Sequence, residues 1–170
     1  MLRGMRHTAL DVIHDEHQAL AAMLRSLSML LAQARREGHL LDCEVLRAML
    51  FYVGEFPERL HHRKESERLF PKLLQRCPEL APVIARLERD HGQGEHAIRE
   101  LEHALLAFEV VGEPRCAAFE QAVERCIRFY LEHMASEEQE PLPAARRSFA
   151  PLFRKILNPA PAPIGLGPAR

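Results

Sequence analysis

Residues 55–71 read Glu-Phe-Pro-Glu-Arg-Leu-His-His-Arg-Lys-Glu-Ser-Glu-Arg-Leu-Phe-Pro. Within this stretch, His61 and Glu65 are four positions apart. On an α-helix such side chains lie about 40° apart around the axis and one turn apart along it, which suits two ligands of one metal centre. The same spacing recurs at His133 and Glu137. An exposed pair of this kind would stabilise a helix by only a few tenths of a kcal/mol. Two matched pairs on separate segments instead favour a shared metal site.

The rest of the chain predicts an all-α fold. Apolar residues recur three and four positions apart, and no stretch alternates with the period of two that is typical of strands. We expect four long helices and a short final one, over about residues 8–38, 43–75, 82–112, 114–139 and 148–157. Thr8 and Asp42 suit N-caps, Gly38 suits a helix end, and Pro57 should break or kink the second helix. Long helices joined by short turns predict an antiparallel up-down-up-down four-helix bundle.

The composition indicates one folded domain and argues against several classes of partner. The 170 residues suffice for a single core, which we assign to residues 1–157, and the Pro-, Gly- and Ala-rich residues 158–170 suggest a flexible tail. The net charge is −1 and charges of both signs are interspersed, so we expect no nucleic acid or membrane partner. Residues 1–7 lack the apolar stretch of a signal peptide, so we expect a cytoplasmic protein. The four cysteines form no Cys-x-x-Cys pair and suggest buried thiols.

The remaining two helices also offer imidazoles. His91 lies on the third helix, and His14 and His17 lie three positions apart on the first, so they share one face and either could coordinate. We favour His14. Imidazole and carboxylate ligands inside a bundle suit iron or manganese, and a glutamate can bridge two ions. Because no cysteine belongs to the set, a thiolate zinc site is disfavoured.

Four segments resemble the sequence blocks of hemerythrin-like, or HHE cation-binding, domains: residues 14–17, 56–71, 90–91 and 133–141. The resemblance spans roughly residues 8–143 and implies a four-helix bundle with two non-haem iron ions bridged by two carboxylates. It implies the metal ligands His14, His61, Glu65, His91, His133 and Glu137.

The chain departs from the oxygen-carrying members of that family. Those members share a second histidine on the third helix and an aspartate near the end of the fourth. At the corresponding positions this sequence has Glu95 and Glu138. The pattern is closer to an iron-centre-repair branch, in which a further histidine follows the first helix. His39 could take that part, or it could be an ordinary loop histidine.

Several other aromatic and imidazole side chains have ordinary interpretations. His62 is turned about 100° from His61 around a regular helix, so a ligand role for both is not expected. His96 and His103 are expected at the surface. Tyr130 could hydrogen-bond near the metals or simply pack in the core.

The predicted function is a non-haem di-iron protein that binds or reduces a small oxidant such as dioxygen, peroxide or nitric oxide. The main alternative is an iron sensor or iron donor whose fold responds to metal occupancy. A third possibility is a bundle that has lost its metal and serves as an interaction module. The two intact His–Glu pairs argue against that third possibility.

Overall fold

A computed structural model describes residues 8–38 and 41–157, and within this part it leaves out the side chains of residues 56–59 and 150–157. Across those ranges the chain is helical apart from short connections, and no strand occurs in them. None of the described helices is both long and apolar enough to cross a membrane. The predicted tail, residues 158–170, and His39 lie outside the described residues.

The first helix, α1 (Ala9–Glu37), begins and ends where the sequence predicts. Thr8 is the N-cap, and its side chain and that of Asp11 form a reciprocal capping box. Gly38 follows the helix in the left-handed conformation, with φ of 64°, which glycine adopts without a side-chain clash. These two signals fix the ends of α1.

The second rod is less regular than predicted. Asp42 caps α2 (Cys43–Val53) as expected, but the rod then passes through a π-helix (Gly54–His61), α3 (His62–Lys64), a second π-helix (Glu65–Leu69) and α4 (Phe70–Arg76). Pro57 lies in the first π-helix and does not break the rod. A proline has no amide hydrogen to donate, so wider turns are one way to continue past it.

The second half of the chain consists of α5 (Ala81–Val111), α6 (Cys116–Gln139) and α7 (Pro141–Leu157). The predicted end of the fourth helix near residue 139 agrees with the end of α6. Pro141, however, is the first residue of α7, which is therefore longer than the predicted piece at 148–157. Proline suits this position because the first helical amide has no acceptor to bond.

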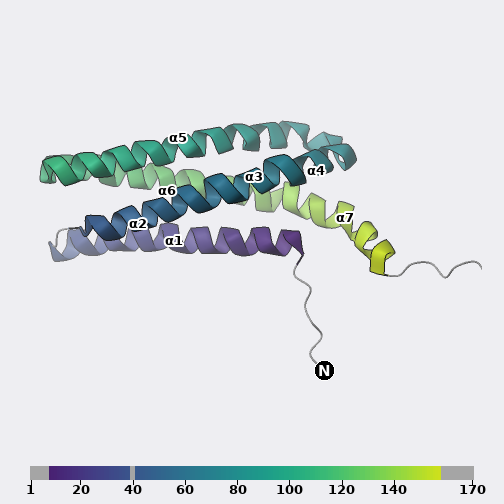
Figure 1. Ribbon diagram of the computed structural model, residues 1–170, viewed down its shortest axis with the longest axis horizontal. Coiled ribbons are helices and arrows are strands. Elements are labelled where there is room, and N and C mark those ends of the chain that lie inside the picture. The colour runs from purple at the N-terminus through teal and green to yellow at the C-terminus, as the bar shows by residue number, and fades with distance from the viewer. Residues whose placement is uncertain (1–7, 39–40, 158–170) are drawn as a thin grey trace, which may run out of the picture.

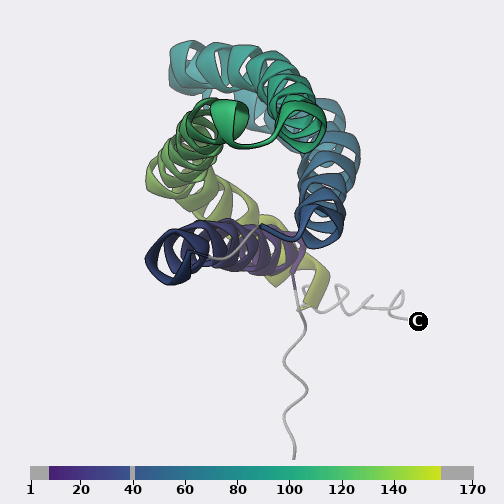
Figure 2. The same cartoon turned by 90° about the vertical axis from the view of Figure 1, so that its left-hand side faces the viewer.

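The long helices form a closed ring. α1 packs against α2 and α6, and α5 packs against the same two helices. Figure 1 shows these rods lying lengthwise beside one another, and Figure 2 shows them end on, arranged around a common axis. The protein is thus a helical bundle, with α7 extending from one end.

Two apolar clusters fill the bundle, one toward each end. The larger includes Leu24, Leu101 and Tyr130, and the smaller includes Phe70 and Leu142. Along α1, the second rod and α5, and from α6 into α7, a short stretch with buried polar side chains lies between the residues of the two clusters. The bundle therefore holds a polar layer between two dry cores.

Candidate metal centre

The polar layer consists of five histidines and two glutamates. Each is buried, and together they are the only buried polar or charged residues in the part of the chain whose side chains are described: His17, His61, His62, Glu65, His91, His133 and Glu137. α1, α5 and α6 each contribute to the layer, and the second rod contributes three residues. Long charged side chains are almost never fully buried unless they are paired, so this layer needs a physical explanation.

The ligand atoms converge as two overlapping sets. His17 and His61 form one set with Glu65 and Glu137, and within it all ligand atoms lie within 4.8 Å of one another. His91 and His133 form a second set with the same two glutamates. Each glutamate therefore belongs to both sets, as a carboxylate that bridges two ions would.

His62 completes the second side of the centre. It forms a further compact set with His91 and His133, and its ring stacks on that of His91 with centroids 4.0 Å apart. One side of the glutamate pair thus faces two imidazoles and the other side faces three.

The choice of His14 as the ligand on α1 does not agree with the geometry. The side chain of His14 is 47 % exposed and bonds Glu138, whereas that of His17 is 3 % exposed and lies in the cluster. The buried face of α1 runs through Leu10, Ile13 and His17, which follow one another at helical spacing. That leucine register was the signal in the sequence that could have selected His17.

His62 was missed for a different reason. On a regular helix His61 and His62 point in directions about 100° apart, and yet both are buried, His61 near Glu65 and His62 stacked on His91. The two residues stand at the junction of a π-helix and α3, where the i to i+5 bonding widens the turn. The prolines at positions 57 and 71 indicate that this part of the helix is irregular. They do not indicate that the turn widens so that both imidazoles become buried.

Many of the atoms in the cluster that could bind a metal have no hydrogen-bond partner among the described residues. They are both oxygens of Glu65, both oxygens of Glu137, Nε2 of His91 and both ring nitrogens of His133. Several lie close together without the geometry of a hydrogen bond, such as His133 Nε2 and Glu137 Oε1 at 3.3 Å. Buried polar atoms are nearly always paired, so orphaned atoms that face one point fit a bound ion.

His17 and His61 supply an independent test of this fit. A carboxylate can only accept, so Nδ1 of His61 donates to Glu16 at 2.7 Å and Nδ1 of His17 donates to Glu138 at 3.2 Å. Nε2 of His17 lies 3.0 Å from Nε2 of His61, so either a proton or a cation must lie between the two nitrogens. Two nitrogens held at a right angle about 2.1 Å from one ion would be about 3.0 Å apart. A cation between them converts repulsion into coordination.

A comparison with known protein families agrees with this geometry. The model of the hemerythrin HHE cation-binding domain matches residues 8–145, which is most of the chain. The chain belongs to this family. No match was found among curated proteins or among solved structures.

Burial sets the charge states in this hemerythrin-like centre. Removal from water, together with the negative charge of Glu137, raises the pKa of Glu65 to about 8. Burial also lowers the pKa of His61 to about 4, which keeps that imidazole neutral and its lone pair free. Burial opposes protonation of His91 and His17, but the nearby Glu137 and Glu65 carboxyls outweigh burial and raise the pKa of His91 to about 9 and that of His17 above its usual value. Protons on these imidazoles balance the carboxylate charge when no metal ion is bound, and metal ions would replace them.

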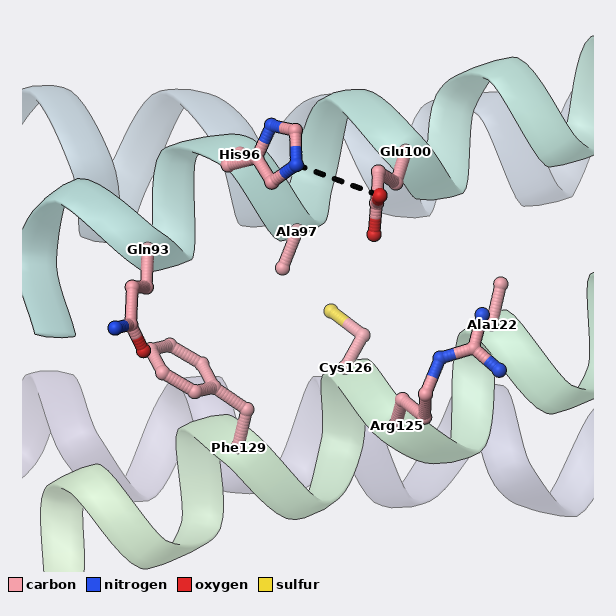
Figure 3. A pocket seen from close by; sticks show the side chains of 8 residues that line it. All are labelled: Gln93, His96, Ala97, Glu100, Ala122, Arg125, Cys126 and Phe129. Carbon is pink, nitrogen blue, oxygen red and sulfur yellow. Dashed lines mark ion pairs between the residues drawn. The ribbon is translucent and has the colours of Figure 1, made fainter.

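One other His-x-x-x-Glu pair lies entirely outside the buried cluster. His96 and Glu100 on α5 approach to 3.4 Å, but their side chains are 70 % and 61 % exposed. They line a groove of about 320 Å³ between α5 and α6. Figure 3 shows the two side chains on α5, with Cys126 pointing toward them from α6. The expectation that His96 is at the surface is confirmed. Burial, and not spacing alone, distinguishes the candidate ligands.

Glu95 and Glu138, the two residues at which the sequence was expected to depart from the oxygen carriers, lie in different surroundings. Glu95 pairs with Arg99 on the exposed side of α5, at 3.2 Å. Glu138 instead contacts His14 and His17. Only Glu138 touches the cluster.

Proposed function

We propose that the protein holds two non-haem iron ions, bridged by Glu65 and Glu137, and that it binds or reduces a small oxidant such as dioxygen, peroxide or nitric oxide. The observation that carries the proposal is the pair of overlapping ligand sets that share both glutamates. We infer an up-down-up-down order for the four rods, which would place one ligand-bearing turn of each rod at the same depth.

The roles of the residues follow from their surroundings. His17 and His61 would hold one ion, and His62, His91 and His133 would hold the other. Bound iron would supply reversible one-electron chemistry. Two imidazoles and two bridging oxygens are fewer ligands than an octahedral ion takes, so a small molecule can bind. The apolar clusters on both sides of the layer restrict water and exclude larger molecules.

The test combines metal analysis with absorption spectra. Protein reconstituted with ferrous iron under anaerobic conditions should contain two iron ions and should develop new absorption bands with at least one of oxygen, hydrogen peroxide or nitric oxide. A His61→Ala variant should lose this response and a His96→Ala variant should keep it. A protein that holds two irons and responds to none of the three reagents would contradict the proposal.

A second function, an iron sensor or donor, is favoured by the orphaned atoms of the layer. Facing carboxylates and imidazoles without a cation are costly to bury, so metal occupancy would tighten the bundle. Limited proteolysis before and after chelation tests this idea, with faster cleavage expected after chelation. Identical cleavage patterns would remove it.

A further inference from the structure

The two sides of the centre are supported differently by the residues behind them. His61 donates from Nδ1 to Glu16 at 2.7 Å, and Glu16 also accepts from Lys64 Nζ at 2.6 Å. His17 donates from Nδ1 to Glu138 at 3.2 Å, and exposed His14 donates to the same oxygen at 3.2 Å. Each imidazole of the two-histidine side therefore donates a hydrogen bond to its own glutamate, and both glutamates are partly exposed.

Two imidazoles of the three-histidine side, those of His91 and His133, have weaker supports. His91 Nδ1 lies 3.1 Å from the hydroxyl of Ser66, which itself donates to Glu88 at 2.9 Å. His133 Nδ1 lies 3.7 Å from Asp90, which is too long for a hydrogen bond. The first of these imidazoles thus faces a neutral hydroxyl and the second only a distant carboxylate.

A carboxylate that accepts from Nδ1 has two effects on a ligand imidazole. It holds the proton on Nδ1, which leaves the Nε2 lone pair free, and it makes Nε2 a stronger donor to a cation. Glu16 suits this role because one of its oxygens accepts from His61 Nδ1 at 2.7 Å while the other accepts from Lys64 Nζ at 2.6 Å, so the carboxylate is held in place from both sides.

We propose that Glu16 and Glu138 are positioning residues that set the metal affinity of the two-histidine side, and that they act through His61 and His17 without binding the ion themselves. This inference rests on the proposed metal centre. It adds that the two ions are held with separable affinities, and that residues outside the ligand set control one of them.

The experiment is a titration of the metal-free protein with cobalt(II) alone, followed by the absorption of bound cobalt and by calorimetry. The wild-type protein should bind two ions. A His61→Ala variant identifies which binding step belongs to the two-histidine side. Glu16→Ala and Glu138→Ala should each weaken that same step by about 10- to 100-fold and leave the other step unchanged.

Conservative variants separate positioning from a merely structural effect. In Glu16→Gln and Glu138→Gln the amide oxygen can still accept from Nδ1, so affinity should return most of the way to the wild-type value. Glu100→Ala, which removes an exposed partner of His96, is the matched control and should bind both ions normally. Melting of each metal-free variant shows whether its fold is intact.

The outcomes are distinct. If the wild-type protein binds no cobalt, the metal centre itself is wrong. If it binds two ions and the alanine variants bind both normally, or lose both steps equally, the positioning role is overturned.

Discussion

At the scale of single residues, His14 and His17 provide a matched pair of variants. Both imidazoles bond Glu138, but only His17 has its Nε2 in the cluster, 3.1 Å from Glu137. We expect His17→Ala to remove one of the two bound ions, because the two-histidine side then keeps one imidazole. His14→Ala should retain both ions. Iron content per protein chain, measured after reconstitution and desalting, checks this, and equal iron in the two variants would contradict it.

His62 allows a second comparison on the opposite side of the centre. Its ring stacks on His91 and lies 5.2 Å from that of His133, between centroids. His62→Ala should lower the affinity for one ion and shift the visible spectrum of the ferric protein, since an imidazole ligand is lost. His96→Ala changes the same residue type on the exposed face of α5 and should have the wild-type spectrum. A His62→Ala spectrum identical to wild type would mean that this imidazole is only packed there.

The sequence motifs predicted most of the residues that cluster in the polar layer. They did not predict that His17 and His62 belong to it as well. His61, Glu65, His91, His133 and Glu137 all lie in the clustered sets. Their assignment as ligands stays a prediction until a metal is bound. The choice between His14 and His17 depended on the register of the α1 leucines, which the motif alone does not contain.

At the scale of the helices, Asp11 joins the start of α1 to α7. Its carboxylate accepts from Thr8 at 2.9 Å and from Arg146 at 3.0 Å. The hydrogen bonds from Thr8, and then that from Arg146, lower the pKa of Asp11 to about 2. A lowered pKa gives stability that is present above the ordinary value near 3.8 and is lost as the pH falls toward 2.

We therefore expect Asp11→Asn to melt at a lower temperature than wild type at pH 7, because the helix start loses a charged acceptor. The difference should shrink as the pH falls from about 4 to about 2, where the wild-type carboxyl is itself protonated. Thermal melts across this range measure it. Glu95→Gln, which alters an exposed pair, is the control. A difference that stays constant with pH would exclude the carboxylate charge as the cause.

The regular helices could be predicted because their ends are local features, whereas the π-helices could not. Thr8 and Asp42 cap the helices by accepting from backbone amides two or three residues away, and Gly38 ends a helix through its own backbone conformation. Such short-range signals can be recognised in the sequence. The turn at His61 and His62 instead depends on what both imidazoles face across the bundle. A helical projection with a fixed period of 3.6 residues turns one of them away from the centre.

At the scale of the whole molecule, two apolar clusters flank the polar layer and do not include its residues. We expect chelation to leave the helical content nearly unchanged but to lower the melting temperature. Metal present at 100 times its dissociation constant stabilises a fold by about 2.7 kcal/mol. Circular dichroism melts with and without chelator measure this. An unchanged melting temperature would mean that the layer holds no metal of consequence to the fold.

The most direct test of the central claim is the anomalous diffraction of iron-loaded crystals, collected at energies above and below the iron absorption edge. The account predicts two iron peaks with Glu65 and Glu137 between them, one beside His17 and His61 and the other beside His62, His91 and His133. An iron-loaded crystal with no peak in this layer, or with a peak only at an exposed pair such as His96 and Glu100, would contradict it.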